Sequence, residues 1–190
     1  DFLAFTGHKG LLGPQGVGGF LISDRLDGQM EPLIAGGTGS SSDSLDMPRT
    51  LPDKYESGTM NLPGIIGLHA ALSYLERTGL ETIRRRKLEL TGYFLEEVKK
   101  LPSVRIAGRQ GTEGRVAVVS LDFEGRDNAV TAFRLEQEYG IMTRVGLHCA
   151  PMAHRALGTF PQGTVRFAFS AANTEDEIDR CVRALHSILD

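Results

Sequence analysis

The stretch from Phe5 to Gly19 constrains this chain most, because it places one lysine among closely spaced glycines between two apolar segments. Lys9 follows the apolar residues 2–5, and a second apolar run, 19–22, follows the glycines. Short apolar runs of this kind predict two buried β-strands. Glycine lets the backbone reach positive φ and approach a ligand closely, so the loop is either a turn with a surface lysine or a loop that closes around a bound molecule.

The order of residues in this loop distinguishes two kinds of ligand chemistry. A nucleotide-binding P-loop carries its lysine after the glycines and follows it with Ser or Thr. Here Lys9 comes before most of the glycines, and Gly10 follows it. A lysine amine at the end of a strand instead suits Schiff-base chemistry with a carbonyl cofactor. Lys9 is therefore the first candidate catalytic residue.

Length, charge and cysteine content limit the classes of protein that fit. The chain has 190 residues, a formal net charge of −3 and two cysteines. This length allows one sizeable core or two small domains, and the charge gives no reason to expect nucleic acid or a membrane surface as a partner. No apolar run could cross a bilayer and no signal pattern is present, so we expect a cytoplasmic protein. The two cysteines form neither a disulfide framework nor a zinc-ligand pattern, and we predict no metal site.

Periodicity and capping residues predict a mixed α/β chain. Region 24–57 is predicted to be irregular, and its Gly/Ser tract at 36–42 is typical of a flexible linker or of an anion-binding turn. Asn61 is a suitable N-cap for a helix that ends at Gly79. Further helices are predicted at 80–100, 127–139 and 174–189, and further strands between Pro102 and Gly108 and at 115–121, 141–145 and 164–170.

Cys149, Cys181 and Arg166 each allow more than one interpretation. Cys181 lies on the apolar stripe of the last predicted helix, so we assign it to the core. Cys149 follows His148 in a polar turn, where a structural role and a nucleophilic role are equally compatible with the spacing. Arg166 lies in an apolar strand, where it could form a structural ion pair, face solvent, or bind a carboxylate with its planar guanidinium.

Several segments together resemble one family. The run Thr6-Gly7-His8-Lys9-Gly10 resembles the pyridoxal phosphate (PLP) lysine segment of the class V aminotransferase group, and Glu56–Asn61 is similar to a further segment near the cofactor, with Met60 where proline is common. The turn at 146–150 is similar to the one that carries the sulfur-accepting cysteine in cysteine desulfurases, with Leu147 in place of a frequent histidine. Within the family, the chain resembles the cysteine desulfurases and selenocysteine lyases.

The resemblance implies a role for each matching residue. Lys9 would hold PLP and move the substrate's Cα proton, while Cys149 would accept sulfur or selenium from cysteine or selenocysteine and leave alanine. A Gly-Gly-Thr turn of the family reaches the cofactor phosphate of the other subunit, which implies a homodimer. The remaining implied residues are His8 as a catalytic and cofactor-binding residue, Thr6, Gly37 and Thr38 for cofactor binding, and Arg166 and Asn173 for the substrate carboxylate.

The resemblance also implies a fold and a domain organisation. Residues 1–87 would be the end of the α/β large domain of a fold type I PLP-dependent transferase, and residues 88–190 its small α+β carboxy-terminal domain. The match is to the carboxy-terminal half of a family member, so we expect that an amino-terminal part is missing from this chain. A sulfur-acceptor protein is the macromolecular partner that the resemblance adds to the amino-acid substrate.

Other functions remain open at this point. A different class V reaction, such as transamination or epimerisation, would use Lys9 and Arg166 but not Cys149. A half that folds and dimerises without holding the cofactor productively is a non-enzymatic alternative. A Cys/His hydrolase fits less well, because no orienting Asp or Asn can be assigned.

Overall fold

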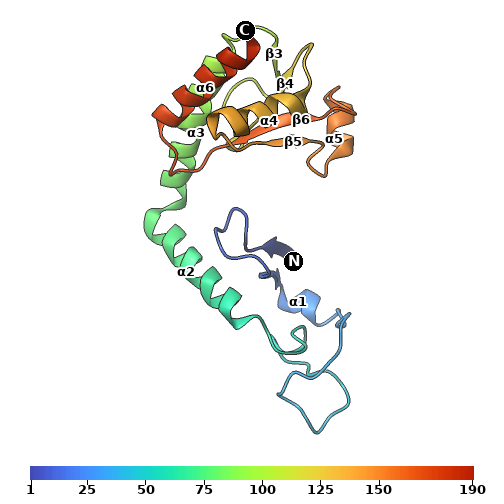
Figure 1. The fold of residues 1–190 in the computed structure, drawn as a ribbon. Coiled ribbons are helices and arrows are strands. Elements are labelled where there is room, and N and C mark those ends of the chain that lie inside the picture. Colours follow the sequence, from blue (N-terminus) through green and yellow to red (C-terminus); the bar gives the residue numbers. More distant parts are fainter. The chain divides into compact units, whose positions relative to one another are not determined.

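The structure is a computed structural model that describes all 190 residues, and it divides into two compact units, residues 1–79 and 80–190. The boundary predicted at Lys87 lies inside helix α3 (Leu80–Val98), so the first compact unit ends before it. The two units are described separately below (Figure 1).

The first unit begins with two antiparallel strands, β1 (Phe2–Thr6) and β2 (Gly18–Ile22), which confirms the two strands predicted around the glycine loop. The prediction that they are buried is wrong, because Phe2 is 49% exposed and Leu21 is 63% exposed. The reason is that these strands form a sheet of two, so most of their side chains lack a neighbouring layer to pack against. The Phe2 and Phe20 rings stack on each other with centroids 5.1 Å apart.

The region predicted to be irregular contains one short helix, α1 (Asp24–Asp27), and otherwise no helix or strand before residue 62. Hydrogen bonds nevertheless connect residues near the two ends of this region. The buried Lys54 donates hydrogen bonds to the carbonyl oxygen of Asp27 at 2.7 Å and to its carboxylate at 3.0 Å, and the Tyr55 hydroxyl donates to the same carboxylate at 2.8 Å. Residues 54–55 are thereby held against the end of α1.

Helix α2 (Leu62–Thr78) has the ends that the sequence predicted. The side chain of Asn61 accepts a hydrogen bond from the Gly64 amide at 3.1 Å, which satisfies one of the free N–H groups of the first turn. Gly79 ends the helix with φ of 84°, a conformation that glycine adopts at little cost. Leu68 and Leu75 are the buried hydrophobic residues of this helix.

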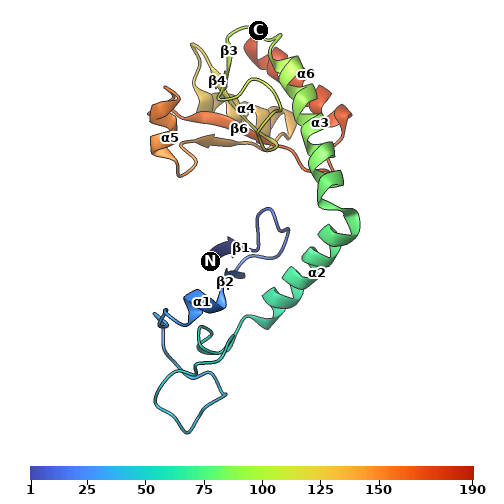
Figure 2. The same cartoon turned by 180° about the vertical axis from the view of Figure 1, so that it is seen from behind.

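The second unit is a four-stranded antiparallel sheet packed against helices. The strand order is β3 (Val104–Ala107), β4 (Val118–Phe123), β6 (Thr164–Ala168) and β5 (Arg144–Gly146). Helices α3, α4 (Asn128–Tyr139) and α6 (Glu175–Leu189) pack together and against the sheet, as the two opposite views in Figures 1 and 2 show. A short helix, α5 (Pro151–Ala156), connects β5 to the segment before β6.

Side chains along the central strands point alternately to the two faces of the sheet, and the buried ones share one face. Val119, Leu121 and Phe123 of β4 are buried on the same face of the sheet. Val119 pairs with Phe167 of β6, and Leu121 pairs with Val165. Because side chains alternate between faces, the residues between them lie on the other face. The core also takes in the apolar sides of the helices, including Phe94, Leu135, Ile178 and Leu185.

Helix α6 confirms the predicted capping box and the structural role of Cys181. The Thr174 hydroxyl accepts from the Glu177 amide at 3.2 Å, and the Glu177 carboxylate accepts from the Thr174 amide at 3.0 Å. Burial raises the pKa of Cys181 to about 12, so its thiol stays protonated and unreactive.

Two strands begin later than the sequence predicted. The strand expected at 115–121 is β4, Val118–Phe123, and before it the Arg115 guanidinium folds back and donates hydrogen bonds to the carbonyl oxygens of Arg109 at 3.0 Å and Val118 at 2.9 Å. The strand expected at 141–145 is β5, Arg144–Gly146. The other predicted helices and strands are confirmed to within two residues at each end. No helix of the structure combines the length and apolar character needed to cross a membrane.

Candidate active site

The Lys9 loop is closed by backbone hydrogen bonds. The Gly7 amide donates to the Val17 carbonyl at 2.9 Å, the Gly13 amide donates to Gly7 at 2.8 Å, and the Leu12 amide donates to Lys9 at 3.0 Å. A Cβ at Gly7 would lie 2.8 Å from the Val17 oxygen. A larger residue would therefore not fit at Gly7, and the loop has a defined shape.

The groups around Lys9 fit a carbonyl cofactor. Lys9 is exposed and its amine makes no ion pair or hydrogen bond within the chain, so it is free to react. Thr6 Oγ1 and His8 Nδ1 share a hydrogen bond of 3.0 Å beside it. A Cβ at Gly10 would meet no atom within 4 Å, so the backbone there is open to a ligand. A primary amine, an imidazole and a hydroxyl beside open glycine backbone are suitable groups for holding PLP.

The Gly37-Thr38 turn lies in the same unit but makes no hydrogen bond to the Lys9 loop. Thr38 Oγ1 is 2.9 Å from the Ser40 hydroxyl, and the Gly37 carbonyl accepts from the Gly58 amide at 2.7 Å. The surrounding residues, 35–48, line a hollow of about 380 Å³. The role in phosphate binding across a dimer stays a prediction.

In the second unit, Cys149 lies at the tip of a tight turn between β5 and α5. The Ala150 amide donates to the Leu147 carbonyl at 2.8 Å, and the two central residues have positive φ, 51° for His148 and 60° for Cys149. Positive φ at both central positions is the mark of a type I′ turn, for which glycine and asparagine are the usual residues. Cys149 is exposed at this turn.

Two glycines bring the strands below this turn into close contact. Gly146 ends β5 with φ of 107°, and a Cβ on Gly163 would lie 2.2 Å from the Gly146 carbonyl carbon and oxygen. Neither backbone could move aside for a side chain there without breaking the pairing of β5 with β6. This contact fixes the base of the Cys149 turn.

Arg166 lies on the sheet face opposite the core, directly across from Arg144. Neither guanidinium makes an ion pair or a hydrogen bond within the chain, so the structural ion pair considered for Arg166 is absent. Like charges at directly opposed positions repel each other and are destabilising without an anion between them. The pair is therefore a suitable site for a carboxylate, which accepts hydrogen bonds from a guanidinium fork.

His148 links the Cys149 turn to this pair of arginines. Partial burial lowers the pKa of His148, and the charges of Arg166, His154 and Arg144 lower it further. The hydrogen bond from His148 Nε2 to the Thr164 carbonyl, 3.2 Å long, opposes this effect only in part. These effects together favour the neutral form of His148.

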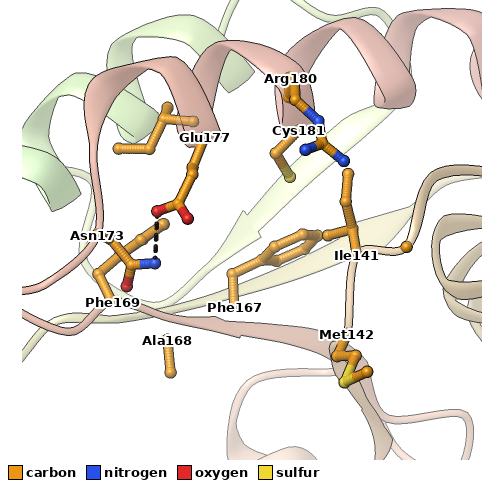
Figure 3. A pocket seen from close by; sticks show the side chains of 11 residues that line it. Ile141, Met142, Phe167, Ala168, Phe169, Asn173, Glu177, Arg180 and Cys181 are labelled. Carbon is orange, nitrogen blue, oxygen red and sulfur yellow. Dashed lines mark hydrogen bonds between the residues drawn. The ribbon is translucent and has the colours of Figure 1, made fainter.

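Asn173 lines a cavity of about 240 Å³ between β6 and α6, but its amide is already engaged (Figure 3). Its oxygen accepts from the Ser170 amide at 2.8 Å, and its nitrogen donates to Glu177 at 2.9 Å. These hydrogen bonds give Asn173 a structural role at the start of α6. Substrate binding by Asn173 stays a prediction.

The structure places five of the eight predicted site residues in two groups. Thr6, His8 and Lys9 form one group in the first unit, and Cys149 and Arg166 belong to the other in the second unit, together with His148, which was not predicted as a site residue. Gly37, Thr38 and Asn173 belong to neither group. Sequence reasoning missed Arg144 and His154. The register that sets Arg144 opposite Arg166 and the burial of His154 depend on tertiary structure, and no local pattern signals either. Across the chain, no group of three or more His, Cys, Asp and Glu residues is arranged to hold a metal ion.

Comparison with known sequences identifies a family and its relatives. Residues 1–181 match the sequence profile of the aminotransferase class V family. A probable cysteine desulfurase of Xylella fastidiosa is 37% identical over 187 residues, which cover 97% of this chain and 44% of that protein. A probable cysteine desulfurase of Methanothermobacter thermautotrophicus is 34% identical, over 99% of this chain and 47% of that protein. The chain spans about half the length of the curated relatives it matches.

Solved structures agree with this comparison. The apo structure of a cysteine desulfurase from Thermococcus onnurineus superposes with a TM-score of 0.90 at 33% identity, over 100% of this chain and 47% of that one. A cysteine desulfurase from Escherichia coli superposes with a TM-score of 0.87 at 32% identity, over 100% of this chain and 46% of that one. The mixed α/β structure of this chain is therefore the one found in cysteine desulfurases.

Proposed function

The chain belongs to the aminotransferase class V family, whose members depend on PLP, and we propose that the protein is a cysteine desulfurase that takes sulfur from cysteine and leaves alanine. The relatives named as cysteine desulfurases support this proposal over nearly the whole chain. The observation that carries it is the exposed Cys149 on a strained turn, with the unpaired Arg166 on a strand below it.

In this proposal, Lys9 and its neighbours bind the cofactor. PLP, when bound, supplies an electron sink that stabilises negative charge at the substrate's Cα. The free amine of Lys9 holds it and then takes and returns the proton at Cα, for which an unpaired lysine is suited. His8, hydrogen-bonded to Thr6, lies next to Lys9 and assists this proton transfer.

Arg166 binds the substrate in this proposal, and Cys149 reacts with it. Arg166 binds the substrate carboxylate through its guanidinium, with Arg144 adding positive charge. The Cys149 thiolate attacks the substrate sulfur, so that a sulfur–sulfur bond forms while the Cβ–sulfur bond breaks with its electron pair left on carbon. Protonation of the substrate then gives alanine, and one sulfur atom remains on Cys149 as a persulfide. The net reaction converts a thiol and cysteine into a persulfide and alanine.

The finer parts of the proposal follow from the family resemblance. Residues 1–87 act as the end of the PLP-binding large domain and 88–190 as the small domain. The active form is a homodimer in which Gly37 and Thr38 contact the cofactor phosphate of the other subunit. Selenocysteine is a second substrate, a further protein accepts the persulfide sulfur, and the enzyme works in the cytoplasm.

Substitution of Cys149 by serine tests the proposal. In the full-length protein with added PLP, Cys149→Ser should retain cofactor absorbance and its change on adding cysteine. Alanine production should fall by at least about 100-fold, because a hydroxyl is a poor nucleophile at neutral pH. Cys181→Ala, which removes the other thiol, is the matched control. If Cys149→Ser makes alanine at the parent rate, a class V reaction without a cysteine nucleophile, such as transamination, is the better proposal.

A further inference from the structure

Two residues of the Cys149 turn have a backbone conformation that is unfavourable for their residue types. His148 and Cys149 both have positive φ, and the turn is closed by the hydrogen bond from the Ala150 amide to Leu147. A residue other than glycine or asparagine is disfavoured in this region, because its Cβ approaches the backbone carbonyl oxygen too closely. Something in the surrounding structure must therefore favour this conformation over a relaxed one.

The imidazole of His148 makes a hydrogen bond that can stabilise this turn conformation. Its Nε2 is 3.2 Å from the carbonyl oxygen of Thr164 at the start of β6. A carbonyl only accepts, so Nε2 carries the proton and donates it. The bond joins the central position of the turn to the neighbouring strand, and Thr164 is fully buried and pairs with Gly146 at the end of β5.

A second histidine supports the first from the other side. His154 in α5 is buried, and its ring centroid is 5.7 Å from that of His148. The Thr159 hydroxyl donates to the His154 carbonyl at 3.3 Å, so it must accept the 2.7 Å bond from His154 Nδ1. His154 is therefore held by Thr159 and offers His148 a fixed surface on which to pack.

We propose that His148 is the positioning residue of Cys149: its imidazole, bonded to the Thr164 carbonyl and packed on His154, holds the type I′ turn that presents the thiol. The proposal takes the use of the thiol from the proposed function. His148 does not act on the thiol as a base here, because its Nε2 proton is committed to a carbonyl. Neighbouring groups on the other elements, Arg166 on β6, Arg144 on β5 and His154 on α5, also oppose a charged imidazole.

The test replaces His148 by Asn, which tolerates positive φ but is too short to reach Thr164. In His148→Asn the Ala150 amide should exchange with solvent about tenfold faster or more, because local opening of the turn becomes easier, while the Val165 amide in the core strand keeps its protection. His148→Gln, whose amide nitrogen is as many bonds from Cα as Nε2, should restore part of the protection. His186→Gln, an exposed histidine of α6, is the control that should change nothing.

Activity and thiol chemistry complete the test. With PLP and cysteine, His148→Asn should lower kcat about tenfold or more with little change in KM, because the sulfur acceptor is misplaced while carboxylate binding is intact. The pH dependence of Cys149 alkylation should be unchanged. A shift of that profile would assign His148 to acid–base chemistry and overturn the proposal, and so would unchanged Ala150 exchange. If the full-length parent protein makes no alanine, the proposed function fails, while the exchange measurement still decides the role of His148.

Discussion

At the scale of single residues, the contacts of the lysines distinguish Lys9 from the others. Lys54 is buried and bonded to Asp27, and this bond raises the pKa of Lys54 and lowers that of Asp27. Lys99 and Lys100 pair with Glu96 and Glu97 at 2.6 Å. Only Lys9 and Lys87 have unpaired amines. An amine must lose its proton before it can attack a carbonyl, so bonding to a carboxylate works against reaction at Lys54.

We predict that PLP followed by borohydride reduction labels Lys9 and not Lys54. Lys87 is the internal control, because it is also unpaired but lies on a helix without the glycine loop, histidine and threonine that surround Lys9. Peptide mapping by mass spectrometry should find the pyridoxyl group at Lys9 in large excess over Lys87, and Lys9→Ala should remove it. Equal labelling of the two would mean that Lys9 reacts only as a free surface amine.

Sequence reasoning proposed candidate reactive residues but did not identify the groups that surround them in the fold. Lys9, Cys149 and Arg166 lie in short motifs whose spacing can be read along the chain. Arg144 and His154 matter because of what they face across the fold, which depends on strand register and burial. The positive φ of His148 and Cys149 was equally inaccessible, because neither residue type is the usual signal of a type I′ turn.

At the scale of elements, the helices were predicted well because their caps are local. Asn61, Asp127 and Thr174 each accept a hydrogen bond from an amide in the first turn of the helix that follows. The strands were less certain, because a strand begins where a partner is available. The Arg115 side chain donates to the carbonyl of Arg109 in the preceding loop and to that of Val118, where β4 begins, although residues 115–117 read as β-formers.

The close approach of β5 and β6 gives a prediction at this scale. Gly163→Ala should lower the free energy of unfolding by about 3 kcal/mol or more, since the new Cβ meets the Gly146 backbone and φ is 76°. Gly125→Ala is the matched control, with the same φ of 76° and no atom within 4 Å of the new Cβ, and it should cost only about 1 kcal/mol. Chemical denaturation of both variants measures the difference. Equal costs would show that the contact with Gly146 yields easily.

At the scale of the whole molecule, the buried hydrophobic residues are divided unequally between the two units. The core cluster lies entirely in the second unit, from Leu90 to Leu189, whereas Leu68 and Leu75 are the only buried hydrophobic residues of the first. The strands of the first unit expose Phe2, Leu3 and Leu21. Burial of apolar surface is the main force that offsets the entropy of ordering a chain, so the two units differ in what stabilises them.

We therefore predict that residues 80–190 fold alone and that residues 1–79 do not. The longer fragment should show a cooperative thermal transition by circular dichroism, and Phe94→Ala, which empties a fully buried position, should lower its stability by about 3–5 kcal/mol. The shorter fragment should show no such transition. A folded 80–190 fragment should also keep its Ala150 amide protected, because His148, Thr164, His154 and Thr159 all lie within it. Loss of that protection in a fragment that otherwise unfolds cooperatively would mean that the Cys149 turn needs contacts from outside residues 80–190.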